Sequence, residues 1–362
     1  MGWLENLVGF DTQNGTGDEI ACLRYLENAL KAYRPDRLIL ETVSRSRGKM
    51  DSGYVLASWG QPKVLLNVHI DTVPVADGWR TDPHKVVLKE GKAYGLGTSD
   101  IKGAAACILA CLDTVQAKDV AVLFSGDEEH GSEVMPVVIK SGHIDGIKRA
   151  IICEPTSALP GKRHRGMLAF STAFSGKGGH SSLADVTERP YLDLARFAAR
   201  LGDYGDAHKD FGEPPYKGLC FNIGHITGDG AYNVIPTTAK LSFSMRPPPG
   251  DDVQARRRDI YAIFEDLDLA ARSDNGLDTL VELEPYETRN INALAPYFPG
   301  HKPVDLPYWT EAALLSEAGV NAVVLGPGDV DQAHKPNEFV STSQLIDAAK
   351  IYKRALSGEV QG

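Results

Sequence analysis

The sequence is poor in cysteine and contains no Cys-x-x-Cys pair. Five cysteines among 362 residues are an odd number without close pairing, which favours free thiols over a disulfide framework. Cys107 and Cys111 are four residues apart in a predicted helix, so both should lie on one buried face. We therefore expect reduced thiols in the core of a cytoplasmic protein.

Long hydrophobic runs and an excess of positive charge are also lacking. No apolar run approaches the ~20 residues that a membrane span requires. The stretch Met1–Asn6 has no basic region and no long apolar segment, so we expect neither a signal peptide nor a membrane anchor. The formal net charge is -10, with 48 acidic and 38 basic residues. A nucleic-acid partner is therefore not expected.

The composition and length indicate a globular protein of two domains. Hydrophobic residues make up 43% of the chain and charged residues 24%. Apolar strands alternate with helices over residues 1–166 and 287–362, which predicts an α/β domain with a mostly parallel, mixed sheet. Residues 167–286 instead carry strands of alternating polarity and two helices. This segment is predicted to be a smaller α+β domain inserted into the first.

An acidic turn follows one of the predicted buried strands. The apolar run Val120–Phe124 leads through Ser125 and Gly126 into Asp127, Glu128 and Glu129. Ligands of open α/β sheets bind at the carboxyl ends of strands. Adjacent buried carboxylates repel each other, and a bound metal ion would remove that penalty. One Glu could then bind metal while the other serves as a base, although a solvated acidic turn is the plain alternative.

The same pattern recurs at other strand ends of the predicted α/β domain. Side chains of ligand type also occur at His69, Asp71, Asp100, Glu154 and His334. Two imidazoles and several carboxylates suit Zn²⁺, Co²⁺ or Mn²⁺, and they are too many for one tetrahedral ion. Two ions sharing a carboxylate would fit. Asp71 shares a strand face with His69 and can orient it. Each residue alone could be a cap, a turn residue or an exposed side chain.

Taken in order, the motifs resemble those of the M20 metallopeptidase family through nearly the whole chain. They are Asn67–Pro74, Gly78-Trp79, Asp82-Pro83, Tyr94–Gly97, Asp100–Gly103, Asp127–Glu129, Glu154–Ser157 and Gly179–Ser182. Within that family, His164-Arg165-Gly166, Tyr308–Ala312 and Gly326–Asp329 are similar to the N-acetylornithine deacetylase branch and its N-acetylcitrulline-deacetylating relatives. Many members have Asp where Glu311 stands, near the expected substrate pocket.

The resemblance implies a role for each candidate of the α/β domain. The implied metal ligands are His69 and Glu154 on one ion, Glu129 and His334 on the other, and Asp100 between them. Zn²⁺ is the expected metal, with Co²⁺ or Mn²⁺ as alternatives. Glu128 would be the general base that takes a proton from the attacking water and passes it to the leaving amine. Asp71 would assist by orienting its neighbouring histidine.

The resemblance also implies roles within the inserted domain. His180 would donate a hydrogen bond to the oxyanion, in some members from the partner subunit, although a polar turn residue is the simpler interpretation. Arg246 would grip the substrate carboxylate with a bidentate fork, or be a surface arginine. Asn233 would lie near the substrate, or be a turn residue. In the family such a domain often pairs two subunits by their edge strands, which implies a homodimer.

The expected function is hydrolysis of a small acylated amino acid. We expect a cytoplasmic enzyme of arginine biosynthesis that removes acetyl from N-acetylornithine or N-acetylcitrulline, with Glu311 near the substrate side chain. Alternatives within the family are a succinyl-diaminopimelate desuccinylase, a dipeptidase or carboxypeptidase, and an amino-carrier-protein hydrolase. An alternative of another class is a non-catalytic binding protein of the same fold.

Overall fold

The computed structural model describes residues 1–46 and 50–360. Internal contacts divide the chain into two compact units. The first contains Met1–Lys162, Thr288–Leu306 and Thr310–Gly362, and the second contains Arg163–Glu287 and Pro307–Trp309. Each unit has its own hydrophobic core. The predicted fold class, a mixed α/β domain with a smaller α+β insertion, is confirmed.

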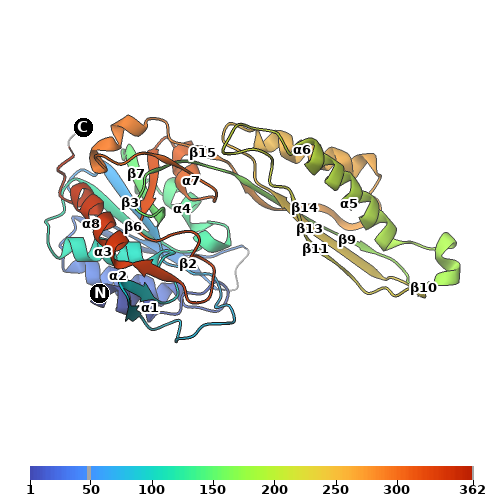
Figure 1. Cartoon of the computed structure of the whole chain (residues 1–362), viewed down its shortest axis with the longest axis horizontal. Coiled ribbons are helices and arrows are strands. Elements are labelled where there is room, and N and C mark those ends of the chain that lie inside the picture. Colours follow the sequence, from blue (N-terminus) through green and yellow to red (C-terminus); the bar gives the residue numbers. More distant parts are fainter. Residues whose placement is uncertain (47–49, 361–362) are drawn as a thin grey trace. The chain divides into compact units, whose positions relative to one another are not determined.

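A nine-stranded sheet lies mainly in the first unit (Figure 1). Its strands are β1 (Arg37–Val43), β2 (Ser52–Trp59), β3 (Val64–His69), β6 (Val120–Ser125), β7 (Arg149–Pro155), β8 (Gly161–His164), β15 (Tyr286–Glu287), β16 (Val304–Leu306) and β17 (Asn321–Gly326). The order is β1-β2-β6-β3-β7-β17-β8-β15, with β16 on β8. The central strands β6, β3, β7 and β17 are parallel. Every residue of β3 and β6 is buried, as their continuous apolar runs predict.

Helices cover both faces of this sheet (Figure 1). They are α1 (Gly2–Val8), α2 (Glu19–Lys31), α3 (Lys102–Leu112), α4 (Val134–Lys140), α7 (Ala312–Glu317) and α8 (Thr342–Leu356), with short 3₁₀ turns η1 (Glu128–His130), η3 (Ile291–Ala293) and η4 (Ala295–Tyr297). The small side chains of α3 let it pack closely against α8, α1 and β3, and nearly all its residues are buried. A small sheet of β4 (Val87–Lys89), β5 (Lys92–Tyr94) and β18 (Phe339–Ser341) ties the segment before α3 to that before α8.

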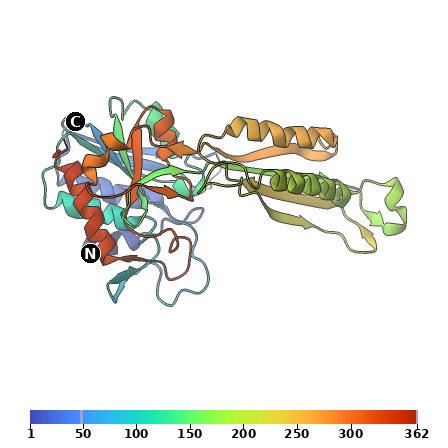
Figure 2. The same ribbon diagram turned by 45° about the horizontal axis from the view of Figure 1, so that its top comes forward.

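The second unit is built on a four-stranded antiparallel sheet. Its strands are β9 (Met167–Ser175), β11 (Asn222–Gly228), β13 (Thr238–Met245) and β14 (Ser273–Leu283), in the order β11-β13-β9-β14. Helices α5 (Pro190–Ala207) and α6 (Val253–Asp266) lie on one face of it (Figures 1 and 2). Strand β13 buries alternate residues against these helices, as its alternating sequence predicts.

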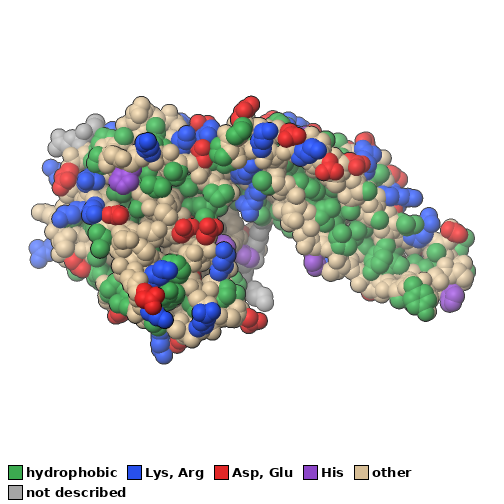
Figure 3. All heavy atoms as spheres, viewed as in Figure 1, with side chains coloured by type: hydrophobic (Ala, Val, Ile, Leu, Met, Phe, Trp, Pro, Cys, Tyr) green, Lys and Arg blue, Asp and Glu red, His purple; other side chains and the backbone are tan. Residues whose placement is uncertain are grey.

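A two-stranded ribbon extends this sheet beyond the ends of β9 and β13. It consists of β10 (Gly179–His180) and β12 (Val234–Ile235). The 3₁₀ turn η2 (Ser181–Val186) directly follows β10 in the chain. Hydrophobic side chains are exposed on this unit toward β10 (Figure 3). They include Leu183, Val186, Leu192, Tyr232 and Val234.

Two details depart from the sequence-based expectations. Strand β14 was not among the predicted elements, because only Leu277 of its eleven residues is buried and two register shifts interrupt its pairing with β9. An edge strand with little burial leaves no clear alternation in the sequence. Four of the five free cysteines are buried as predicted, but Cys220 is exposed. No helix in the described part of the chain has both the length and the apolar character needed to cross a bilayer.

Candidate metal centre

The acidic turn after β6 is closed by Asp127. This residue has a left-handed backbone, with φ of 69°, a conformation that Asp tolerates better than most residues. Its backbone carbonyl accepts the N–H of Ser132 at 2.7 Å. Its buried carboxylate accepts the N–H of Glu133 at 2.8 Å and a hydrogen bond from Arg45 at 2.9 Å. These hydrogen bonds of Asp127 hold the turn that carries Glu128 and Glu129 in place.

Asp71, at the end of β3, connects this turn to His69. Its Oδ1 lies 3.3 Å from Nδ1 of His69. The same carboxylate accepts the backbone N–H of Glu128 at 3.2 Å and that of Glu129 at 3.0 Å. Burial acts to raise the pKa of Asp71, but hydrogen bonds from His69 and from the Glu129 amide outweigh it and lower that pKa. Nδ1 of His69 also lies 3.1 Å from the backbone carbonyl oxygen of Asp71. Asp71 therefore contacts both the imidazole and the turn, and its role in orienting His69 stays a prediction.

The five predicted metal ligands gather in two halves that meet at Asp100. Nε2 of His69 lies 3.1 Å from Oδ1 of Asp100 and 3.5 Å from Oε1 of Glu154. Nε2 of His334 lies 2.9 Å from Oε1 of Glu129 and 3.6 Å from Oδ2 of Asp100. The ligand atoms of His69, Asp100 and Glu129 all lie within 4.8 Å of one another. This arrangement offers one imidazole and one carboxylate on each side of a shared carboxylate.

The buried negative charge of this cluster would be stabilised by bound cations. Burial raises the pKa of Glu154 above its usual range and that of Glu129 to about 7. The pKa of His334 rises to about 9, chiefly through its hydrogen bond with Glu129. Without metal, protons on imidazoles and carboxylates must balance the buried negative charge. Divalent ions would replace those protons, and the oxygen and imidazole donors fit Zn²⁺, Co²⁺ or Mn²⁺.

Glu128 lies beside the half of the cluster that contains His69 and Glu154. One of its carboxylate oxygens lies within 4.8 Å of the ligand atoms of His69 and Glu154. Burial raises the pKa of Glu128 well above its ordinary value, and the neighbouring Glu154 carboxylate adds to that rise. A carboxylate with a raised pKa beside the candidate metal ligands can take up and release a proton at this position.

Glu338 was not among the predicted site residues. Its buried carboxylate accepts three backbone N–H groups, from Gly97 at 2.9 Å, Ser99 at 2.7 Å and Asp100 at 2.9 Å. It therefore holds the loop that presents Asp100. Burial raises its pKa to about 8. Its position four residues after His334 could have suggested a role at the site. The sequence does not show, however, that an acidic residue of a loop will be buried.

Glu311 lies next to the acidic turn and is 1% exposed. Its carboxylate accepts hydrogen bonds from Asn67 at 2.7 Å, Ser132 at 3.1 Å and Ser125 at 3.4 Å. Burial raises its pKa to about 7. Both carboxylate oxygens thus have partners within the first unit, and a substrate-binding role for Glu311 stays a prediction.

The candidates of the second unit occupy two different ends of its sheet. His180 is exposed, and its Nδ1 lies 2.8 Å from the Ser182 hydroxyl. It pairs with Val234 in the β10-β12 ribbon, next to Asn233. Arg246 follows the other end of β13, an eight-residue strand. Because a strand rises about 3.3 Å per residue, roughly 25 Å of sheet separate Arg246 from the ribbon. A single copy of this unit does not bring Arg246 together with His180 and Asn233.

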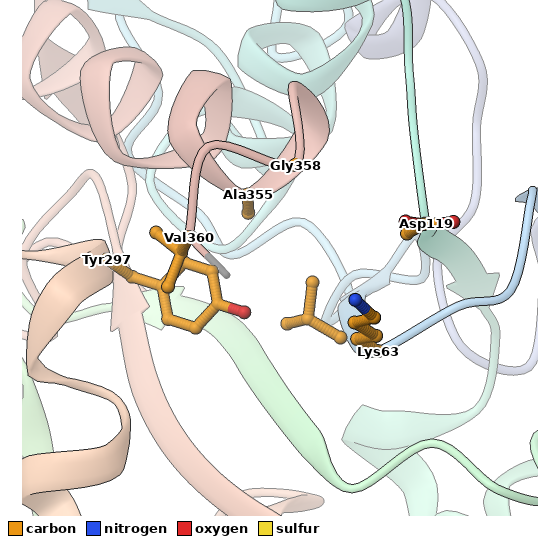
Figure 4. A pocket seen from close by; sticks show the side chains of 7 residues that line it. Lys63, Asp119, Tyr297, Ala355, Gly358 and Val360 are labelled. Atoms are coloured by element: carbon orange, nitrogen blue, oxygen red, sulfur yellow. The ribbon is translucent and has the colours of Figure 1, made fainter. Parts of the chain in front are cut away.

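A small cavity in the first unit lies at the opposite end of its strands (Figure 4). It borders Val64 at the start of β3 and Asp119 just before β6, and the side chains of Lys63, Tyr297 and Val360 surround it. Its volume of about 20 Å³ suits one water molecule. It is too small for an amino acid, so the strand ends at the acidic turn stay the candidate site.

Comparison with known proteins defines the class. Residues 65–358 match the model of peptidase family M20/M25/M40, and the chain belongs to this family, as its motifs predicted. The chain is 33% identical to the N-acetyl-L-citrulline deacetylase of Xanthomonas campestris, over 98% of this chain and 96% of that protein. It is 30% identical to the acetylornithine deacetylase of Myxococcus xanthus, over 82% of this chain and 80% of that protein. These relatives identify the chain as an amide hydrolase, which confirms the predicted enzyme class.

Solved structures share the fold at lower identity. The dipeptidase Dug1p from Saccharomyces cerevisiae has a TM-score of 0.77 at 17% identity, covering 99% of this chain and 96% of that one. A Bacillus subtilis peptidase, described as a dinuclear metal-binding member of the M20 family, has a TM-score of 0.65 at 14% identity, with 99% and 96% covered.

Proposed function

We propose that this protein is a two-metal deacetylase that hydrolyses the amide bond of N-acetylcitrulline or N-acetylornithine. The observation that carries the proposal is the pair of imidazole–carboxylate halves that meet at Asp100, with Glu128 beside them. The substrate class is inferred from the names of the relatives, a citrulline and an ornithine deacetylase. The setting that we propose for the reaction is arginine biosynthesis.

The metal-binding part of the proposal assigns each ligand to one ion. The assignment is His69 and Glu154 to one ion, Glu129 and His334 to the other, and Asp100 to both. Two bound divalent ions would polarise the amide carbonyl and lower the pKa of water. Asp71 keeps the His69 imidazole in place, and Glu338 keeps the Asp100 loop in place. Zn²⁺ is the metal we propose, with Co²⁺ or Mn²⁺ able to replace it.

Glu128 is proposed to move the proton. Its carboxylate takes a proton from the attacking water as the water oxygen bonds to the carbonyl carbon. It then delivers that proton to the amine nitrogen as the C–N bond breaks, so the products are acetate and the free amino acid. The buried position of Glu128 supports this role, because burial raises its pKa and so helps it to hold a proton between the two steps.

Arg246 is proposed to bind the α-carboxylate of the substrate. The side chain is partly buried, and burial lowers its pKa. Among the described residues of the second unit, no carboxylate forms an ion pair with Arg246, and Cys220 is the one titratable group that affects its pKa. A partly buried guanidinium without an anion is suited to a bidentate pair with a carboxylate ligand. His180 is proposed to stabilise the oxyanion and Asn233 to lie near the substrate.

The separation of these residues supports a homodimer. Arg246 and the ribbon that carries His180 and Asn233 lie roughly 25 Å apart along the sheet, farther than one acetylated amino acid can reach. A second copy could supply the distant residues. The edge strand β11 is mostly exposed, with Ile226 at 56% exposure. An exposed edge with apolar side chains is suited to pairing with the same strand of a second copy.

A substrate panel tests the proposed specificity. We expect kcat/KM to be highest for N-acetylcitrulline or N-acetylornithine when these are measured beside N-succinyl-diaminopimelate, dipeptides and other acetylated amino acids. A higher kcat/KM for a dipeptide or for the succinylated compound would replace the proposed function with that alternative. No hydrolysis of any compound by the metal-loaded protein would favour a non-catalytic binding protein.

Metal removal tests the chemistry. Chelation, checked by elemental analysis, should abolish deacetylation, and addition of Zn²⁺ or Co²⁺ should restore it. Because the two halves share Asp100, we expect close to two ions per chain at full activity. Full activity of a protein proven to be free of metal would refute the metal mechanism.

A further inference from the structure

A buried arginine contacts the acidic turn through Asp127. Arg45 follows β1, and its side chain is 2% exposed. Its NH1 lies 2.9 Å from Oδ1 of Asp127 and 3.2 Å from Oε1 of Glu19. Its Nε donates to the carbonyl of Met50 at 2.7 Å. One guanidinium thus balances two buried carboxylates, and neither of them is a candidate metal ligand.

Both anchors of the acidic turn connect to this guanidinium. The first is Asp127, whose other carboxylate oxygen accepts the N–H of Glu133 at the far end of the turn. The second is Asp71, which accepts the N–H groups of Glu128 and Glu129. Asn14 joins Asp71 to Arg45, because its Nδ2 donates to Asp71 at 3.1 Å and its Oδ1 lies 3.5 Å from NH1 of Arg45.

We propose that Arg45 is a positioning residue for the acidic turn. Through Asp127 and through Asn14–Asp71, it sets the place of Glu128 and Glu129 relative to His69. The inference rests on the proposed function, because it assigns these two side chains to proton transfer and metal binding. Without the cation, Asp127 and Glu19 would be buried negative charges with no compensating positive charge. Relief of that state requires each carboxylate either to take up a proton or to move toward water. Either change alters the hydrogen bonds by which Asp127 holds the turn.

The geometry requires arginine rather than lysine. The guanidinium uses NH1 for the two carboxylates and Nε for the Met50 carbonyl, three contacts that need a planar fork. A lysine ammonium keeps the charge but is a compact group on a flexible stem. It can satisfy the electrostatic demand without holding Asp127 in one orientation. An Arg45→Lys variant therefore separates the two contributions, charge and orientation.

The test compares Arg45→Met, Arg45→Lys and a matched control. Arg256 in the second unit also bridges two carboxylates, 3.2 Å from Asp251 and 3.1 Å from Asp259, and its further hydrogen-bond partners Tyr204 and His208 belong to the same unit. For Arg45→Met we expect kcat to fall about 10- to 100-fold and the Co²⁺ affinity of the metal-free protein to fall by a similar factor. KM should change little. Arg45→Lys should give a smaller loss in both, and Arg256→Met should give neither.

The Co²⁺ titration, followed by its visible absorption, needs no substrate and so separates this inference from the proposed function. If the unmodified protein binds Co²⁺ but deacetylates nothing, the titration of the variants still decides the role of Arg45. Should Arg45→Met fail to fold, the double variant Arg45→Met/Asp127→Asn removes the cation together with its partner carboxylate. It should fold and still bind Co²⁺ weakly. Co²⁺ affinity and kcat equal to those of the unmodified protein in either folded variant, or equal losses in Arg256→Met, would overturn the proposal.

Discussion

The two units differ in the number of acidic side chains that they bury. The first unit buries six acidic side chains, namely Glu19, Asp71, Asp127, Glu154, Glu311 and Glu338. The second is built around an apolar core of Leu and Phe side chains such as Phe197 and Phe243, and the exposed side chains on its surface include large apolar ones. Burying carboxylates opposes folding unless they gain partners. The buried carboxylates of the first unit are typical of a chemical site, whereas the exposed apolar side chains of the second unit suit the proposed roles in binding and association.

The largest effect should come from the base in the first unit. Replacing Glu128 by Gln keeps the size of the side chain but removes its capacity to accept a proton. We expect kcat to fall by about 10²- to 10⁴-fold while the protein still binds two metal ions. Steady-state kinetics with elemental analysis measures both. Turnover near that of the unmodified protein would show that the base lies elsewhere.

A smaller loss should follow from replacing a buried carboxylate that only supports the site. Glu338→Gln replaces one of the two carboxylate oxygens by an NH₂ donor, so the side chain can no longer accept all three loop N–H groups around Asp100. We expect kcat or metal affinity to fall by about 10- to 100-fold. Kinetics and a Zn²⁺ titration would measure this effect. Glu317→Gln changes an exposed acid at the end of α7 in the same unit; it is the control and should change neither.

In the second unit the expected effect is on binding rather than on chemistry. Arg246→Lys keeps the charge but loses the bidentate fork, so KM for the acetylated amino acid should rise about tenfold with kcat nearly unchanged. An N-acetylated amine that lacks the α-carboxylate should not distinguish the variant from the unmodified protein. A fall in kcat at constant KM would contradict the division of roles between the units.

An effect on stability rather than on activity should appear in the pH dependence of unfolding. Burial raises the pKa of Glu19 from 4.5 to about 7. The folded state therefore holds this proton more tightly than the unfolded state, and its contribution to stability falls as pH rises from about 4.5 to about 7. Glu19→Gln should remove that loss and gain about 2 kcal/mol relative to the unmodified protein between pH 5 and pH 7.5. Urea unfolding of the metal-free proteins at both pH values measures the difference, and a constant difference would refute the assignment.

Much of the first unit follows from local sequence. The runs that form β3, β6 and β7 are largely apolar and end where the ligand-type side chains begin. The sequence alone therefore predicts both the end of each strand and the candidate ligand that stands there. His69 and Asp71 illustrate this, because their spacing along one strand already implied their contact. The family assignment from the order of the motifs is confirmed.

The supporting residues were not predictable in the same way. Arg45 is separated from Asp127 by 82 positions, and Glu338 from Asp100 by 238. Both look like ordinary charged loop residues in the sequence, because burial and partner are set by long-range packing. Glu311 is similar, since its contact with Asn67 spans 244 positions. Strand β14 shows the same limit for the fold, because pairing with β9 rather than apolar periodicity defines it.

The sequence by itself determined the fold class, the family and the chemical identity of the candidate ligands, because strands and ligand motifs are short-range patterns. Only the tertiary structure decided which carboxylates are buried, which cation balances them and which backbone amides hold them. It also placed Arg246 and His180 at different ends of one sheet. These properties depend on desolvation and on contacts between distant segments, and neither is encoded in any single stretch of the chain.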